Sequence, residues 1–444
     1  ERSRGLGDVY KRQLPLRPIN DYDIMAIKRS DIEIMAPVGS YESLMAAVAA
    51  GADSVYFGVG QLNMRSRSAA NFTLDDLARI VATARQYGVK TYLTVNTILY
   101  DDEVEEMRRV VDCALREGVD AVIASDQSAI LYARSVGMEV HISTQLNVSN
   151  TETLRFYSRW ADVVVLAREL NLGQIRQIYD NILAQRICGP SGRPVKIEMF
   201  AHGALCMGIS GKCYLSLHEC GESANRGACR QICRRSYELR DRDTGETIAV
   251  EGRYLLSPKD LCTIPFLDRF IEAGVRVLKI EGRARSAEYV KRVVETYDEA
   301  LRAIEEGTYS PERAAVWTER LAEVFNRGFW GGYYQGAPVV ELSANYGSSA
   351  TVRKVYVGKI TNFFKKIGVA EIQVEASPLE RGARYVVLGE TTGALEGSAD
   401  EVYVADRPAE TAPQGVFCSV KTPGPVRRGD KLYKIVPASE VVTQ

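Results

Sequence analysis

Apolar residues follow two different patterns along this chain. From residue 32 to about residue 310, a short apolar run rich in β-branched residues is followed by Gly or Asp, and then by a stretch with apolar residues every three or four positions. This alternation predicts parallel strands joined by amphipathic helices. Beyond residue 352 the runs alternate apolar with polar residues and are separated by Gly and Pro, which is typical of short strands and tight turns.

The first pattern contains eight runs with the length of buried strands. They are Ile32–Val38, Ser54–Val59, Lys90–Asn96, Ala121–Ser125, Glu139–Thr144, Asp162–Ala167, Lys196–His202 and Val277–Gly282. Amphipathic stretches predict helices, for example over Leu74–Tyr87, Val104–Glu117 and Ala287–Ile304. Eight such units predict an α/β fold, a TIM-type (β/α)8 barrel over residues 25–310.

The second pattern predicts a small C-terminal β-barrel domain over residues 352–444. Its expected strands are Tyr356–Thr361, Gly368–Val374, Ala383–Leu388, Val416–Val420 and Asp430–Ile435. Residues 311–351 are predicted to form a helical linker between the two domains. At the other end, Asp8–Gln13 resembles a translated sequencing adapter, so we expect residues 1–24 to be a non-native or disordered leader ahead of Met25.

The composition fits a globular protein with more than one core. The 444 residues are 46% hydrophobic and 25% charged, and the net charge of -1 means that a polyanion must bind to a local basic patch. No apolar run approaches the roughly 18–20 residues that cross a bilayer, so we expect no membrane insertion. Nine cysteines are too few for a disulfide scaffold in a chain of this length, which indicates reduced thiols and a cytoplasmic location.

Five of the nine cysteines lie close together within one insertion. A long segment, residues 204–270, separates the seventh expected strand from the eighth and contains Cys206, Cys213, Cys220, Cys229 and Cys233. Four thiolates satisfy either one tetrahedral Zn²⁺ or the four irons of a [4Fe–4S] cluster, and their spacing leaves both open. Unligated buried thiols are the third alternative.

Glycines in the insertion favour one set of four ligands. Gly211 precedes Cys213 by two residues and Gly227 precedes Cys229 by two, which permits close backbone approach. The expected metal ligands are therefore Cys206, Cys213, Cys229 and Cys233. Cys220 remains an alternative to one of the last two, because a loop of this length is able to fold back.

Polar residues stand at the carboxyl ends of the expected barrel strands, where barrel enzymes place their working groups. They include Asn96, Gln145, Arg168, His202, Lys279, Glu281 and Arg283. Each has another explanation when taken alone, because polar residues there also cap helices and satisfy loop backbone. The insertion adds arginines that either bind an anion or form a solvated basic surface, namely Arg226, Arg230, Arg234 and Arg235.

Several motifs of the chain resemble a single family. They are Glu198–Cys206, Gly211–Ser216, Asn225–Arg234, Ser257–Leu261 and Lys279–Arg283. Together they resemble the family long labelled peptidase U32, with similarity from about Ile32 to Tyr334. The terminal β-domain also resembles the C-terminal module of that family.

The resemblance implies a function different from the family label. Members studied as enzymes are oxygen-independent hydroxylases of RNA or of the ubiquinone ring, and they hold an iron–sulfur cluster through cysteines placed like these. One barrel followed by one short β-domain resembles the branch that forms 5-hydroxyuridine at the tRNA wobble position, in which prephenate is implicated. The resemblance thus implies a [4Fe–4S] cluster, with zinc as the alternative, and tRNA and prephenate as partners, and it gives no expectation for a protein partner.

We therefore expect the barrel mouth to hold a flipped RNA base. His202 and Glu281 are the candidates for proton transfer, and both are expected to face the same cavity. The candidates for substrate binding are Asn96, Gln145, Arg168, Lys279, Arg283 and Arg226. The terminal domain is expected to contact RNA phosphates through Arg353, Lys354, Lys359, Lys365, Lys366, Arg427, Arg428 and Lys431.

Three other functions remain open from the sequence. They are hydroxylation of ribosomal RNA or a ubiquinone precursor, a U32-type peptidase, and a zinc-stabilised RNA-binding scaffold. The sequence contains no His-Glu-x-x-His motif and only three histidines, so it gives the peptidase label no support.

Overall fold

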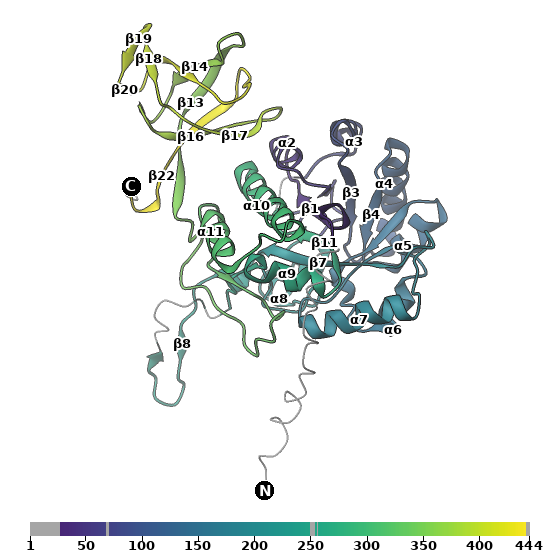
Figure 1. Cartoon of the computed structure of the whole chain (residues 1–444). Helices are drawn as coiled ribbons and strands as arrows, with labels where there is room; N and C mark the ends of the chain where they lie inside the picture. Colours follow the sequence, from purple (N-terminus) through teal and green to yellow (C-terminus); the bar gives the residue numbers. More distant parts are fainter. Residues whose placement is uncertain (1–26, 68–70, 249–253, 255, 441–444) are drawn as a thin grey trace.

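The structure is a computed structural model that describes residues 27–67, 71–248, 254 and 256–440. The expected leader over residues 1–24, together with Met25, lies outside the described residues. Figure 1 shows two lobes, a barrel surrounded by helices and a β-rich terminal lobe beside the end of the barrel helices.

Eight parallel strands form a closed barrel, as predicted. They are β1 (Glu33–Pro37), β2 (Ser54–Phe57), β3 (Lys90–Val95), β4 (Ala121–Ala124), β5 (Glu139–Ile142), β6 (Val163–Val165), β7 (Lys196–Gly203) and β11 (Val275–Ile280). Strands β1 to β7 pair in sequence order, and β11 pairs in parallel with both β7 and β1, which closes the sheet. The predicted fold class is confirmed.

Helices follow most of these strands. They are α2 (Tyr41–Ala49), α3 (Leu77–Gln86), α4 (Val104–Glu117), α5 (Gln127–Ser135), α6 (Thr151–Tyr157), α7 (Leu172–Ala184), α9 (Leu267–Glu272) and α10 (Ala287–Glu305). Helix α4 has the predicted bounds and ends at Gly118, whose φ of 81° places it in the left-handed region that glycine adopts freely. Side-chain caps set several starts, as where Asn171 accepts a hydrogen bond from the backbone of Gln174.

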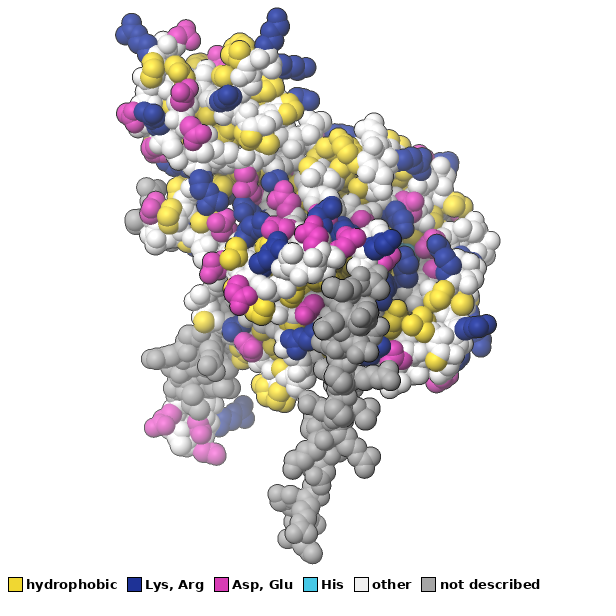
Figure 2. All heavy atoms as spheres, in the orientation of Figure 1, with side chains coloured by type: hydrophobic (Ala, Val, Ile, Leu, Met, Phe, Trp, Pro, Cys, Tyr) yellow, Lys and Arg dark blue, Asp and Glu magenta, His cyan; other side chains and the backbone are white. Residues whose placement is uncertain are grey.

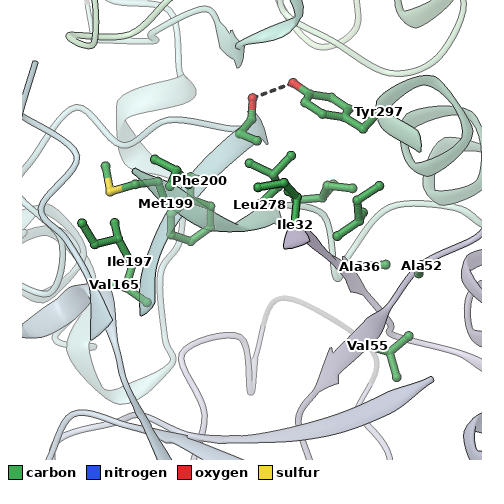
Figure 3. Close-up of a cluster of buried hydrophobic side chains, with 14 of the residues drawn as sticks. Ile32, Ala36, Ala52, Val55, Val165, Ile197, Met199, Phe200, Leu278 and Tyr297 are labelled. Carbon is green, nitrogen blue, oxygen red and sulfur yellow. Dashed lines mark hydrogen bonds between the residues drawn. The ribbon is translucent and has the colours of Figure 1, made fainter. Parts of the chain in front are cut away.

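The barrel strands bury apolar side chains on both faces. Ile197 and Met199 of β7 and Leu278 of β11 belong to the large core that also includes helix side chains, and Figure 3 shows them packed among other apolar groups. Tyr56 and Tyr92 belong to a separate cluster of inward-facing residues. The alternation of faces along each strand therefore fills the barrel interior and also attaches the helices.

The cysteine-rich insertion lies between β7 and β11. It contains α8 (Leu215–Cys220), the 3-10 turns Ala224–Arg226 and Ile232–Arg234, and the strands β8 (Leu239–Arg240), β9 (Thr247–Ile248) and β10 (Asp260–Cys262). Strand β10 pairs antiparallel with the end of β7, so the insertion returns to the barrel rim. Backbone bonds from Ile98 to Asn225 and from Arg67 to Gly227, both 3.3 Å, join the insertion to the loops that follow β3 and β2.

Residues 311–351 contain α11 (Pro311–Ala322) and β12 (Phe329–Trp330). Trp317 and Leu321 of α11 are buried in the main barrel core. Strand β12 extends the barrel sheet by pairing with β10. This segment therefore packs as part of the barrel lobe.

The terminal lobe is an antiparallel β-domain, as predicted. Its strands are β13 (Val352–Phe364), β14 (Val369–Val374), β15 (Leu379–Glu380), β16 (Arg384–Gly389), β17 (Gly393–Ser398), β18 (Val402–Val404), β19 (Arg407–Ala409), β20 (Thr411–Ala412), β21 (Phe417–Lys421) and β22 (Lys431–Pro437). Eight of them form one sheet, in the order β17-β16-β22-β13-β14-β21-β18-β19. All five predicted strands are present.

The two lobes share a packed interface. Ala46 of α2, Ala287 of α10 and Ala394 of β17 belong to one buried cluster. Arg292 pairs with Glu396 at 2.5 Å across the same boundary. Among the described residues, no helix combines the length and apolar character that a membrane crossing requires.

Candidate functional site

A cavity of about 140 Å³ lies at the carboxyl ends of the barrel strands, between the strand ends and the insertion. Ten of the twelve predicted site residues line it: Asn96, Gln145, Arg168, Lys279, Glu281, Arg283, Cys206, Cys213, Cys229 and Cys233. His202 and Arg226 are not among the lining residues. The cavity is therefore the place where the predicted thiols and the predicted charged residues meet.

The four predicted cysteine ligands share this cavity, whereas Cys220 is not among the residues that line it. Burial raises the pKa of Cys233, the charge of Arg234 lowers it, and the thiols of Cys206, Cys229 and Cys213 raise it. The four thiols are thus within electrostatic reach of one another. Cys220 is exposed at the end of α8.

Four thiolates are the ligand number of both one Zn²⁺ and a [4Fe–4S] cluster. Among the described side chains, no three Cys, His, Asp or Glu residues are close enough to share one metal ion. A cubane cluster binds each thiolate at a different iron, so its four ligands stand further apart than those of one Zn²⁺. The four thiols around this cavity supply the number of ligands that a cubane cluster requires.

Two glycines dock the insertion onto the barrel loops. Gly227 has a φ of +81°, and a Cβ added to it would lie 2.5 Å from the backbone oxygen of Asn63. Gly211 has a φ of +71°, and its Cβ would lie 3.0 Å from Cβ of Gln145. These glycines permit the close approach of the insertion to the barrel, which places the cysteines that follow them over the cavity.

Three cations line the barrel side of the cavity. The Nζ of Lys279 donates a 2.7 Å hydrogen bond to Oε1 of Glu198, and both side chains are buried. Arg283 donates from Nη1 to Oγ1 of Thr94 at 3.0 Å, and burial lowers its pKa to about 10, so it remains charged at neutral pH. Arg168 stacks 3.9 Å above the ring of Phe200, and its buried Nε has no hydrogen-bond partner among the described residues. Arg168 therefore retains donor capacity for a ligand.

Glu281 faces an arginine that the sequence reasoning missed. Arg65, in the loop after β2, pairs with Glu281 at 2.7 Å. Burial raises the pKa of Glu281, but the charges of Arg65, Arg168 and Arg283 oppose burial and leave that pKa below its usual value. Glu281 is therefore held as an ionised carboxylate. The signal for Arg65 was the length of the loop between β2 and α3, since long connections in compact domains are often functional.

The amides of Asn96 and Gln145 form a polar wall of the cavity. Asn96 donates from Nδ2 to Ser143 at 3.3 Å and to Gln145 Oε1 at 3.4 Å. Its Oδ1 accepts a 3.2 Å bond from the backbone of Met64. The two predicted substrate-binding amides are thus held together at the ends of β3 and β5.

His202 lies outside the cavity, so the expectation that it faces the same cavity as Glu281 is wrong. Its ring packs against Phe329, Tyr297 and Tyr289, with centroids 5.5, 5.8 and 6.1 Å away. Burial lowers its pKa to about 3. The cause is a shift in the register of β7 against β11 between Phe200 and His202, because one extra residue turns the following side chain to the other face.

Arg226 also lies away from the cavity, so the structure does not bring it together with the other residues expected to bind the substrate. Its guanidinium donates to both carboxylate oxygens of Glu103, at 2.8 and 2.6 Å, and lies 3.7 Å above the ring of Tyr100. Arg226 thus fastens the insertion to the loop after β3. The three arginines expected beside Arg226 also have protein partners: Arg230 pairs with Glu222, Arg235 with Glu219, and Arg234 with the carbonyls of Leu205 and Pro258.

A family model described as peptidase family U32 matches residues 39–343. The chain belongs to this family. The matched range contains most of the barrel, the whole insertion, α11 and β12, and it ends before β13 begins. All the residues that line the cavity of this U32 chain lie within the matched range.

Relatives of this U32 chain have names that describe different activities. A Porphyromonas gingivalis protein named collagenase is 55% identical over 405 residues, which are 91% of this chain and 98% of the relative. The tRNA hydroxylation protein P1 of Bacillus subtilis is 32% identical over 77% of this chain and 80% of its own length. A 23S rRNA 5-hydroxycytidine synthase of Escherichia coli is 40% identical over 63% of this chain and 41% of its own length.

Proposed function

We propose that this chain is an RNA hydroxylase that forms 5-hydroxyuridine at the wobble position of tRNA. The observation that supports this most is the meeting of four cysteines with Arg168, Lys279 and Arg283 around one cavity at the catalytic end of a barrel. Relatives named tRNA hydroxylation protein and 23S rRNA 5-hydroxycytidine synthase support the reaction class.

The proposed cofactor is a [4Fe–4S] cluster held by Cys206, Cys213, Cys229 and Cys233. Such a cluster supplies electron transfer when bound, which suits an oxidation. Replacing the C5–H bond of uridine by a C5–OH bond is a two-electron oxidation of the base, so the co-substrate that supplies the oxygen must also take up the two electrons, and the proton from C5 goes to a base. We propose prephenate as the small-molecule co-substrate, because its carboxylates match the guanidinium groups of Arg168 and Arg283.

The residues of the chain bind the base and move the proton. The amides of Asn96 and Gln145 offer donors and acceptors to the edge of a base that has left its stack. Glu281 is the carboxylate that accepts the proton released from C5. Arg65 keeps Glu281 ionised and in place through their 2.7 Å contact.

Peptide hydrolysis is the second candidate, because a relative named collagenase is 55% identical. A cysteine nucleophile needs a neighbouring base, most often histidine. Of the three histidines in the chain, none belongs to the described residues that line the cavity. The arrangement of the cavity therefore favours hydroxylation.

The test is mass analysis of tRNA nucleosides from cells with and without this gene. We expect 5-hydroxyuridine and its derivatives to disappear on deletion and to return with the wild-type gene. Cys213→Ala should fail to restore them, whereas the matched variant Cys220→Ala, which alters a thiol outside the cavity, should restore them. Unchanged tRNA nucleosides would refute the proposal. Loss of a hydroxylated base from ribosomal RNA alone would show that the substrate is ribosomal RNA and not tRNA. Cleavage of gelatin by the purified protein, abolished by Cys213→Ala, would favour the second candidate.

A further inference from the structure

Two surface grooves meet at a pair of adjacent arginines. The first groove, about 810 Å³, lies on the terminal domain, where the end of β13, β14 and the start of β21 line it. The second, about 610 Å³, lies between the terminal domain and the barrel. Arg427 and Arg428 line both grooves, so the grooves join at the turn between β21 and β22.

This turn has a defined shape. The buried carboxylate of Asp430 accepts a 2.8 Å bond from the backbone N–H of Arg427 and a 2.5 Å bond from the hydroxyl of Thr392. The backbone N–H of Asp430 donates to the carbonyl of Arg427 at 3.1 Å. Gly429, at φ +93°, completes the turn. Asp430 thus fixes the backbone while the side chains of both arginines are exposed.

Three cations in the lining of the grooves have no side-chain partner among the described residues, whereas three of the four carboxylates there accept a hydrogen bond or form an ion pair. Among the described residues, Lys365, Arg428 and Lys431 line the grooves and make no side-chain hydrogen bond or ion pair. Three of the four acidic residues in the lining are already bonded: Glu371 to Thr361, Glu390 to Arg79, and Asp430 within the turn. Figure 2 shows Lys and Arg side chains projecting from the terminal lobe. The hydrogen bonds of Glu371 and Asp430 leave their charges in place, so among the described residues the groups available to a phosphate are the three unpaired cations Lys365, Arg428 and Lys431.

An exposed aromatic ring lies among these cations. Phe417, at the start of β21, is 51% exposed and lines the first groove together with Lys365 and both arginines. A ring beside free cations is the combination that binds single-stranded nucleic acid, because bases stack on the ring while cations contact phosphates.

The second groove lies at the catalytic end of the barrel. Ser40 and Ser286 line it, and they are the N-caps of α2 and α10, the helices that follow β1 and β11. The loop from β11 to α10 carries Arg283 in the cavity and, three residues later, Ser286 in the groove. A chain bound in the grooves thus passes beside the loops that form the cavity.

We propose that the two grooves bind the phosphate backbone of the RNA whose base enters the cavity, with an unpaired base stacked on Phe417. The identity of the ligand as RNA rests on the proposed function. Lys365, Arg427, Arg428 and Lys431 supply the phosphate contacts. Of the eight cations expected from the sequence to contact phosphates, Lys354 and Lys359 are instead paired with Glu288 and Glu375.

The experiment measures equilibrium binding of an unmodified tRNA transcript to the full-length protein at several salt concentrations. Arg427→Ala/Arg428→Ala should weaken binding at least tenfold and lower the slope of log affinity against log salt by about 1.4–1.8, the value for two lost phosphate contacts. Phe417→Ala should weaken binding while leaving that slope unchanged, because stacking releases no counterions. The matched control is Arg381→Ala/Arg407→Ala, which removes the same charge from the same domain at residues outside both grooves, and it should bind like the wild type.

The possible outcomes distinguish a failure of the groove proposal from a failure of the proposed function. Equal losses in the groove variant and the control would overturn the proposal, since they would reflect net charge alone. Binding to vesicles of anionic lipid in preference to the transcript would also overturn it. If the groove variants lose tRNA binding but nucleosides are unchanged on gene deletion, the proposed function fails and the groove stands as an RNA site. If hydroxylation is lost on deletion but the groove variants bind normally, the function stands and the groove proposal fails.

Discussion

Replacing Gly227 by alanine tests whether docking of the insertion, rather than the cysteines alone, organises the cavity. Gly227 has a φ of +81°, and its backbone oxygen accepts a 3.3 Å bond from the N–H of Arg67. A matched control exists in the same insertion. Gly221 has a φ of +68°, but a Cβ added there would meet nothing within 4 Å.

The magnitudes separate the two substitutions. An alanine in the left-handed region costs roughly 1–2 kcal/mol, and both variants bear that strain. The Cβ at position 227 would also lie 2.5 Å from the backbone oxygen of Asn63 and in conflict with the hydroxyl of Ser66. Overpacking of this kind costs about 1–3 kcal/mol, because a backbone oxygen cannot rotate away as a side chain does. Gly227→Ala should therefore open the docked insertion about 5- to 150-fold more often than Gly221→Ala does.

Hydrogen exchange of the backbone amides of Arg67 and Ile98 measures this opening, because both amides bond to the insertion. Both should exchange faster in Gly227→Ala and near the wild-type rate in Gly221→Ala, and iron content should fall only in the first variant. Equal exchange in the two variants would refute the reasoning, because it would show that the contact with Asn63 contributes nothing beyond backbone strain.

Three further predictions concern single side chains. Protein purified without oxygen should keep its iron in Cys220→Ala and lose it in Cys233→Ala, and the opposite result would show that the ligand set is wrong. The pKa of His202 is lowered from 6.5 to about 3, so the unfolded state binds the proton first as pH falls. The free energy of unfolding of the wild type, measured with urea, should therefore fall by up to about 1.4 kcal/mol per pH unit between these two values. The variant His202→Phe should lack this contribution. Lys279→Met should destabilise the barrel by about 3–5 kcal/mol, because it leaves Glu198 buried without its cation. Adding Glu198→Leu to this variant should restore most of the lost stability. Similar urea midpoints for the wild type and Lys279→Met would contradict this prediction.

The barrel was predictable because buried parallel strands appear as continuous apolar runs of four to eight residues. Five of the six terminal-domain strands with five or more residues were predictable from alternation and turn residues, and β17 was not among them. Strands β15, β19 and β20 contain only two or three residues, and such runs are too short to show a period of two. Strands β15 and β20 pair with each other from distant parts of the domain, and β19 pairs with β18, the strand just before it.

The site was partly predictable for a similar reason. Residues at or directly after the ends of parallel strands converge at one end of a barrel, so six of the expected residues meet in one cavity, whereas the four expected cysteines reach it through docking of the insertion. His202 was misplaced because its direction depends on a register shift against β11, which no local pattern reveals. Arg226 was misplaced because its partner Glu103 is 123 residues away in sequence.

Docking of the insertion and binding of metal by its cysteines are separable in this structure. The ion pair between Arg226 and Glu103 attaches the insertion to the barrel, and so do the backbone hydrogen bonds from Ile98 and Arg67. None of these contacts involves a thiol. The thiols are therefore brought around the cavity by contacts with the loops after β2 and β3. Those same loops carry Arg65 and Asn96, which line the cavity. One set of contacts thus positions the cysteines and the substrate-binding residues relative to each other, so a change in docking should disturb both, whereas the loss of a single thiol should disturb only the metal.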